Sequence, residues 1–231
     1  MTADNLDEAQ SEKLRSVMRA IMVMRIKEAD SDPVEIIPGL FIGSIGAALN
    51  KDGLLAVGIT HVLCAAGGIK LYFPETFTYK QVIIGDKINS DMYSHLPGCC
   101  NFIGKALKPG GKVLVHCFAG QSRSATVIAA YLMLTQKLNL EAAVSLMRSK
   151  RKQVQPNPGF CAQLLKWGKY IASLSQNGQP QHSQKPQQQL SRASGSAVSA
   201  GNHGYGRSRG RRASSPLAHE IPIGDIAATV Q

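Results

Sequence analysis

Cysteine is scarce in this chain of 231 residues, and the five cysteines present are an odd number that cannot all pair. Small secreted domains that rely on disulfides usually carry an even, patterned set. Here the cysteines lie mostly inside apolar runs, and the polar, acidic start of the chain has no apolar signal segment. The sequence therefore predicts a reducing compartment, the cytoplasm and also the nucleus, and no disulfide framework.

Long apolar runs are missing as well. No uninterrupted stretch approaches the roughly 20 residues that a membrane-spanning helix needs. Thr2 stands where N-myristoylation would require a glycine. We expect a soluble protein that has no membrane partner.

Motifs for metals and nucleotides are absent too. The six histidines are scattered, and Cys99 and Cys100 are adjacent instead of being spaced as C-x-x-C. No Gly-Lys is followed by serine or threonine, which excludes a Walker A phosphate loop. The sequence predicts no metal site and no cofactor.

Acidic residues are fewer than basic ones. The chain has 15 acidic residues against 26 lysines and arginines, which gives a net charge of +11. The segment 175–231 carries +4 of this charge and is rich in Gln, Ser, Gly and Arg. It has almost no aromatic residues and no apolar period, so we expect it to be a disordered tail. Its arginine cluster leaves RNA binding open as a secondary function, although such runs are more often solvated and nucleic acid is not the expected partner. The cluster comprises Arg207, Arg209, Arg211 and Arg212.

Residues 1–32 form an N-terminal arm that contains a predicted basic amphipathic helix. From Lys13 to Lys27 there are five basic residues and no acidic one, while apolar residues such as Leu14 and Met18 recur at helical spacing. Two interpretations stay open. The helix suits a calmodulin-type groove, and it also suits simple packing on its own domain.

Residues 33–174 alternate short β-rich runs with helical patterns, which predicts one α/β domain with a mostly parallel central sheet flanked by helices. Asn50, Asp91 and Asn139 are placed to cap helices. The expected strands are 35–37, 40–43, 60–64, 79–84 and 112–116.

The most informative stretch is an apolar strand ending at His116, a loop of small residues, and a helix that follows at once. This order surrounds one point with backbone N–H groups and the positive end of a helix dipole, which predicts a site for a phosphate-sized anion. Gly120 would allow close backbone approach. The residues expected to bind phosphate are Phe118, Ala119, Gly120, Gln121, Ser122 and Arg123.

Cys117 stands at the mouth of that loop. The field that binds an anion also stabilises a thiolate, so Cys117 would be a nucleophile at neutral pH. Arg123 can grip two oxygens of a bound phosphate through its planar guanidinium. Ser124 can donate to the departing sulfur or serve only as a helix cap. Free cysteines are usually structural, and that interpretation is preferred for Cys64, Cys99, Cys100 and Cys161.

His116-Cys117-x5-Arg123-Ser124 resembles the signature of cysteine-dependent protein phosphatases, and the segment 115–133 is similar to their dual-specificity branch. The resemblance covers the whole middle zone. Segment 37–44 resembles that branch's opening strand, 58–63 its second strand, and 156–164 its last helix.

The resemblance implies a fold like that of the protein tyrosine phosphatases and roles for further residues. Asp86 would be the general acid; of the other nearby acids, Asp91 is better placed to cap a helix and Glu75 to be a solvated loop residue. Asn157 would brace the phosphate loop or be only a turn residue. His116 would lower the pKa of the Cys117 thiol through its hydrogen-bond network and would not itself transfer a proton. Phe118, Ala119, Gln121 and Ser122 would act through their backbone, so their side chains should matter less.

The activity implied is hydrolysis of phosphotyrosine and phosphoserine or phosphothreonine in proteins, through a phosphocysteine. The loop has no lysine of the kind that meets the extra phosphates of inositol lipids, which favours phosphoproteins, with mitogen-activated protein kinases as one candidate class. Two alternatives stay open. One is a catalytically silent phosphoprotein-binding module of the same fold; the other is an RNA-associated phosphatase that uses the arginine-rich tail.

Overall fold

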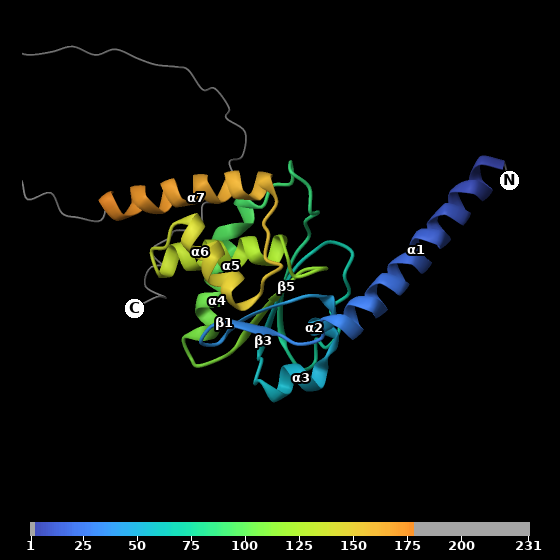
Figure 1. Ribbon diagram of the computed structural model, residues 1–231, viewed down its shortest axis with the longest axis horizontal. Coiled ribbons are helices and arrows are strands. Elements are labelled where there is room, and N and C mark those ends of the chain that lie inside the picture. Colours follow the sequence, from blue (N-terminus) through green and yellow to red (C-terminus); the bar gives the residue numbers. More distant parts are fainter. Residues whose placement is uncertain (1–2, 178–231) are drawn as a thin grey trace, which may run out of the picture.

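The computed structural model describes residues 3–177, and its core is a five-stranded sheet (Figure 1). The strand order is β1-β2-β5-β3-β4, with β1 antiparallel to β2 and every other pair parallel. The mostly parallel sheet expected from the sequence is confirmed. The strands are β1 (Val34–Ile37), β2 (Leu40–Gly43), β3 (His61–Ala65), β4 (Thr78–Val82) and β5 (Val113–His116).

Helices cover both faces of the sheet because the buried strands are apolar on both sides. Val113 and Val115 of β5 face the larger core cluster, while Leu114 between them faces a second cluster on the opposite side. Helices α4 to α7 pack in the larger cluster, and α2 and α3 lie toward the second. The helices are α1 (Ala3–Ala29), α2 (Ile45–Leu49), α3 (Lys51–Ala56), the 3₁₀ turn η1 (Tyr93–His95), α4 (Leu96–Leu107), α5 (Arg123–Thr135), α6 (Leu140–Lys150) and α7 (Pro158–Asn177).

Helix α5 lies in the middle of the larger core and is buried from Ser124 to Met133. The single tryptophan, Trp167 of α7, packs against it and donates its indole N–H to the carbonyl of Ala130 at 3.1 Å. The N-terminal end of α5, at Arg123, carries the site described below.

Two of the three predicted caps, Asn50 and Asn139, have their expected partners. The side chain of Asn50 accepts from the N–H of Gly53 at the start of α3, and that of Asn139 accepts from Ala142 at the start of α6. Asp91 accepts from the N–H of Ser94, but the N-cap residues of η1 and α4 are Met92 and His95, so Asp91 supports the turn before η1 and is not the predicted helix cap.

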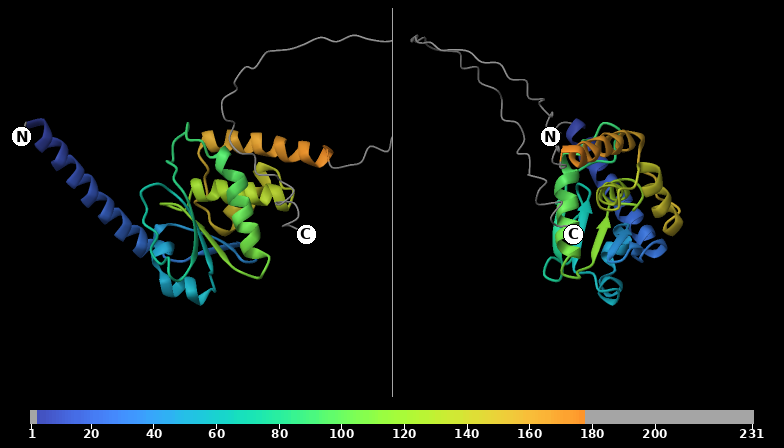
Figure 2. Two further views of the ribbon diagram at one scale, coloured as in Figure 1. Left: turned by 180° about the vertical axis from the view of Figure 1, so that it is seen from behind. Right: turned by 90° about the vertical axis from the view of Figure 1, so that its left-hand side faces the viewer.

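Helix α1 packs on the domain only at its C-terminal end, and the rest projects away from it (Figure 2). Val23 and Ile26 are partly buried against Ile45 of α2, whereas Leu14 and Met18 are 62% and 64% exposed. The two interpretations of this helix therefore apply to different parts of it: one end packs on its own domain, and the other leaves its apolar residues uncovered.

Within residues 3–177, no helix combines the length and apolar content needed to cross a membrane. Helix α7 continues three residues past the boundary predicted at residue 174. The remainder of the predicted tail, including its arginine cluster, lies outside the described residues.

Candidate active site

The site is built on the loop between β5 and α5. Strand β5 ends at His116 and α5 begins at Arg123, so the loop lies at the carboxyl edge of the parallel strands. The N-terminal end of α5 adds its unpaired N–H groups and partial positive charge at the same place. The strand, loop and helix predicted from the sequence are confirmed.

Cys117 lies at the start of this loop and is buried, with 1% of its surface exposed. Its Sγ is 3.3 Å from the hydroxyl of Ser124 and accepts the N–H of Gly120 at 3.3 Å. When the sulfur is a thiolate, Ser124 must be the donor, and both contacts then stabilise negative charge on sulfur. The contact has the geometry that the expected donation from Ser124 to the sulfur requires.

The other four cysteines lie in surroundings that favour the thiol, and all but Cys161 are buried. Burial raises the pKa of Cys64 to about 11 and that of Cys99 to about 12. Burial raises the pKa of Cys100 as well, and the pKa of Cys161 in the same direction. These environments agree with the structural role preferred for the four residues.

Gly120 turns the loop with a positive φ of 65°. A Cβ there would lie 2.6 Å from the carbonyl oxygen of Gly43 and 2.7 Å from a guanidinium nitrogen of Arg151. Only glycine fits both the backbone conformation and the space.

Arg123 and Asp86 meet at the rim of the loop. Nε of Arg123 is 3.5 Å from Oδ2 of Asp86, and Nη1 donates to the carbonyl of Ile84 at 3.4 Å. Nε is buried and within ion-pair range of the carboxylate, yet it makes no hydrogen bond. Most donors of this guanidinium are therefore available to an anion in the loop.

Asp86 is held in position by two hydrogen bonds to one of its oxygens. Oδ1 accepts from the hydroxyl of Ser122 at 2.7 Å and from the side-chain amide of Asn157 at 2.8 Å. The expectation that the side chain of Ser122 matters little is wrong, because its hydroxyl links the loop to Asp86 and also accepts the backbone N–H of Asn157 at 3.1 Å.

Asn157 contacts the phosphate loop and also caps the helix that follows it, a second role that was not expected. It contacts the loop through Ser122, and its Oδ1 accepts the N–H of Phe160 at 2.9 Å at the start of α7. One residue thus joins the start of α7 to the carboxyl group of Asp86 and to the phosphate loop.

The sequence reasoning missed Arg151. Its buried guanidinium donates to the carbonyls of Gly120 at 3.0 Å and Ala119 at 3.3 Å, and it forms a two-point ion pair with Asp30 at the end of α1. Binding these carbonyls from outside leaves the loop's N–H groups free to face an anion. Burial would raise the pKa of Asp30, but the hydrogen bonds and charge of Arg151 outweigh it, and the pKa is lowered. Nothing in the neighbouring sequence distinguishes Arg151, because it lies in a run of basic residues of the kind usually found on a solvent-exposed surface.

His116 lies behind the nucleophile and is 2% exposed. Its Nδ1 is 3.2 Å from the carbonyl oxygen of Cys117 and must carry the proton to bond there. Burial, helped by the nearby Arg123, lowers the pKa of His116 from 6.5 to about 4. The ring is therefore neutral at physiological pH, and it supports the loop backbone rather than the sulfur directly.

This shift predicts an acid-dependent loss of stability. As the pH falls, His116 of the unfolded chain binds a proton below pH 6.5, whereas His116 of the folded chain does so only near pH 4. Protonation therefore favours the unfolded chain, and the free energy of unfolding decreases as the pH falls from 6.5 to 4. We expect this effect of His116 to lower the free energy of unfolding by about 3 kcal/mol between pH 6.5 and pH 4. Urea titrations at several pH values measure it, with His116→Asn as the comparison. Parallel pH profiles for the two proteins would contradict the prediction.

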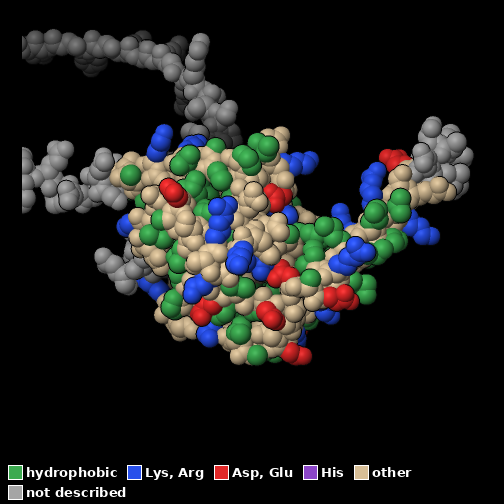
Figure 3. Space-filling view, viewed as in Figure 1, with side chains coloured by type: hydrophobic (Ala, Val, Ile, Leu, Met, Phe, Trp, Pro, Cys, Tyr) green, Lys and Arg blue, Asp and Glu red, His purple; other side chains and the backbone are tan. Residues whose placement is uncertain are grey.

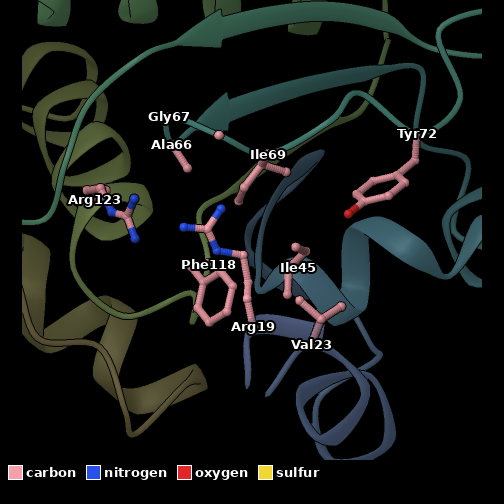
Figure 4. A pocket seen from close by; sticks show the side chains of 10 residues that line it. Arg19, Val23, Ile45, Ala66, Gly67, Ile69, Tyr72, Phe118 and Arg123 are labelled. Carbon is pink, nitrogen blue, oxygen red and sulfur yellow. The ribbon is translucent and has the colours of Figure 1, made fainter. Parts of the chain in front are cut away.

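A cavity of about 200 Å³ adjoins the loop (Figure 4). It is lined by Phe118 and Arg123 on one side and by Arg19 and Val23 of α1 on another. The side chain of Phe118 therefore forms part of a wall, which the backbone-only expectation did not include. Gln121 is exposed and lines a separate hollow beneath α1.

Among residues 3–177, no group of three His, Cys, Asp or Glu side chains is arranged to hold a metal ion.

The chain is similar to a known protein family and to individual proteins. A family model described as the catalytic domain of dual specificity phosphatases matches residues 40–170. Dual specificity protein phosphatase 1B of Arabidopsis thaliana is 43% identical over 147 residues, which cover 64% of this chain and 88% of that protein. MAP kinase phosphatase with leucine-rich repeats protein 3 of Dictyostelium discoideum is 46% identical over 59% of this chain and 16% of its own length.

Solved structures resemble the fold over the same region. A mouse putative dual specificity phosphatase complexed with zinc tungstate has a TM-score of 0.61 and 31% identity, covering 63% of this chain and 91% of its own. The human tyrosine phosphatase-like serine/threonine/tyrosine-interacting protein has a TM-score of 0.60 and 34% identity, covering 62% of this chain and 99% of its own.

Proposed function

Because this chain belongs to the family of dual specificity protein phosphatases, we propose that it hydrolyses its phosphoprotein substrates through a phosphocysteine on Cys117. The observation that carries this is the contact of Sγ with the Ser124 hydroxyl and the Gly120 N–H, beside Arg123 and Asp86. The tungstate named for the mouse relative is an oxyanion of phosphate-like shape, which supports an anion site in this fold.

In the first step the Cys117 thiolate attacks phosphorus and the bond to the ester oxygen breaks. Asp86, as the acid, gives its proton to that oxygen. Oδ1 of Asp86 accepts hydrogen bonds from Ser122 and Asn157, and Oδ2 lies 3.5 Å from Nε of Arg123 at the rim of the loop. Arg123 and the loop amides bind the phosphoryl oxygens as charge builds up on them.

In the second step water attacks phosphorus, the S–P bond breaks and phosphate leaves. The Asp86 carboxylate takes the proton from water, which restores the acid. The sulfur departs as a thiolate, and the hydroxyl of Ser124 at 3.3 Å donates to it as its negative charge returns.

Asp86→Asn tests the acid. Asparagine keeps the hydrogen-bonding shape but has no proton to transfer, so turnover of an alkyl phosphate, which needs protonation of its leaving oxygen, should fall about 10²- to 10³-fold. Turnover of an aryl phosphate with an acidic leaving group should fall much less. The measurement is kcat across a leaving-group series.

The control for this series is Asp91→Asn, which removes a carboxylate that only accepts from Ser94. It should leave both classes of substrate close to wild type. Equal loss on both classes in Asp86→Asn would identify another residue as the acid.

The phosphocysteine itself can be trapped. Mixing the enzyme with phosphopeptide and quenching in acid should leave a phosphate-mass increment on the peptide that contains Cys117, detected by mass spectrometry. Cys161→Ser, which alters a cysteine away from the loop, should still give the adduct. An adduct that is absent at every quench time while phosphate is released would argue against the covalent route.

A silent binding module is the main alternative, and one solved relative is described as a phosphatase-like interacting protein. Here the nucleophile, arginine and aspartate are all present and assembled, which favours an enzyme. Tight binding of phosphopeptides with no release of phosphate would favour the module.

We further propose that the substrates include mitogen-activated protein kinases and that the enzyme acts in signalling in the cytoplasm and nucleus. The relative from Dictyostelium discoideum is named as a MAP kinase phosphatase, which supports this substrate class. Substrate trapping from cells with Cys117→Ser or Asp86→Ala, read by mass spectrometry, would identify the targets. Imaging of the full chain would test its location.

We propose that a protein of the calmodulin type binds residues 13–27 of helix α1. Leu14, Met18 and Met22 of this helix are exposed. Figure 3 shows hydrophobic and basic side chains side by side along the helix. Calcium-dependent binding of the full chain to calmodulin should be weakened by Leu14→Glu. Leu165→Glu, which alters an exposed leucine on α7, is the matched control.

A further inference from the structure

One face of helix α1 carries a row of apolar side chains that the domain leaves uncovered. Members of the row follow one another at alternating intervals of three and four residues, which is the spacing of the a and d positions of a two-stranded coiled coil. A helix with such a row is stabilised by burying it against a second helix. We call these residues the α1 seam: Leu14, 62% exposed, Val17, 49%, Ile21, 48%, and Met24, 66%.

The α1 seam lies on the opposite side of the helix from the face that packs on the domain. Val23 and Ile26 pack on the domain, and each follows a seam residue by two positions. At 3.6 residues per turn, two positions are about 160° apart around the helix. The ion pair of Asp30 with Arg151 fixes this end of α1 to the domain. The seam therefore stays open along its length, even where the helix touches the domain.

The charges of α1 are divided between its two ends. Segment 3–12 has four acidic residues and no basic one, whereas segment 13–27 has five basic residues and no acidic one. Two copies of the helix placed antiparallel bring the acidic end of each onto the basic part of the other, while a parallel pair brings like charges together. Because α1 projects away from the domain (Figure 1), an antiparallel pair also keeps the two catalytic domains at opposite ends.

We propose that two copies of this chain associate by antiparallel pairing of their α1 helices along the α1 seam. Because the second helix runs in the opposite direction, Leu14 of one copy lies against Met24 of the other, and Val17 lies against Ile21. The pairing buries the apolar row of both copies at once, which supplies the free energy of association. The seam overlaps the segment 13–27 proposed above to bind a calmodulin-type protein, so the two partners exclude each other.

The first test is sedimentation velocity of the full chain at concentrations from about 1 to 100 µM, where we expect a monomer–dimer equilibrium. Ile21→Glu places two charges in the paired seam, one from each copy, and should weaken the association constant about 100-fold. The matched control is Met22→Glu, which makes the same change at the next residue, 55% exposed and outside the seam, and should keep the dimer. Both variants should hydrolyse a small aryl phosphate at the wild-type rate, which shows that the domain is folded.

A cross-linking experiment tests the direction of pairing. Leu14→Cys and Met24→Cys are prepared separately, mixed and treated with a short bis-maleimide. The mixture should give peptides joined between positions 14 and 24, identified by mass spectrometry. Neither variant alone should join two copies at its introduced thiol, because equivalent positions of an antiparallel pair lie about 15 Å apart along the helices.

Several outcomes would overturn this inference. One is a wild type that stays monomeric over the whole concentration range, and another is a dimer that Ile21→Glu leaves unchanged. Equal weakening in Met22→Glu would indicate general charge repulsion instead of a seam. Cross-links within each single variant and none in the mixture between positions 14 and 24 would show a parallel pair. Calcium-dependent binding of calmodulin without any self-association would assign the seam to that partner alone.

Discussion

Replacing Cys117 by serine should lower kcat at least about 10⁴-fold, because a serine hydroxyl is not ionised at neutral pH and the loop contains no base to activate it. That factor corresponds to about 5 kcal/mol of lost transition-state stabilisation. The surroundings of Sγ explain the dependence on sulfur. The Gly120 N–H and the Ser124 hydroxyl both point at it from 3.3 Å, and they favour an anion there but cannot remove a proton from serine.

Phosphopeptide binding should survive the Cys117→Ser change, because Arg123 and the loop amides remain. Turnover is measured by phosphate release and affinity by titration calorimetry. Cys161→Ser provides a control for the loss of a thiol elsewhere. Turnover equal to wild type in Cys117→Ser would rule out the cysteine mechanism.

Replacing Arg123 by lysine should lower kcat/KM about 10³-fold, because lysine offers a point charge where two phosphoryl oxygens need a planar fork. The position of the Arg123 side chain shows why lysine cannot replace its contacts. The guanidinium is held at the rim by Asp86 and the carbonyl of Ile84, and a shorter ammonium cannot keep both contacts and reach the loop centre.

The control for Arg123→Lys is Arg148→Lys, which changes an arginine whose Nε donates to the carbonyl of Val154 away from the loop. It should stay within a few-fold of wild type. Steady-state kinetics on one aryl phosphate measure both variants, and a mild effect at Arg123 equal to that at Arg148 would contradict its role.

Much of the fold followed from patterns that are local in the chain. The strands ending at Gly43 and His116 and the caps at Asn50 and Asn139 agree with their sequence signals, since alternation and capping depend on near neighbours. The strand expected to run to residue 84 ends at Val82 instead. Strand order and the antiparallel pairing of β1 were not predicted, because they depend on contacts between distant segments.

The sequence alone predicted the candidate nucleophile Cys117, the arginine Arg123 and the loop between them, because strand, loop and helix are continuous and their geometry is local. The tertiary structure decided how Asp86, the proposed acid, is held. Asp86 lies far from the loop in the chain and is fixed there only because Ser122 and Asn157 converge on one of its oxygens.

The tertiary structure alone also revealed the support around that loop. Asp30 and Arg151 are 121 positions apart and meet behind Gly120 and Ala119. Arg19 faces the cavity only because the end of α1 packs on the domain. A sequence pattern records which groups are present, but a buried ion pair or a shared cavity exists only once the packing of the core has brought distant segments together.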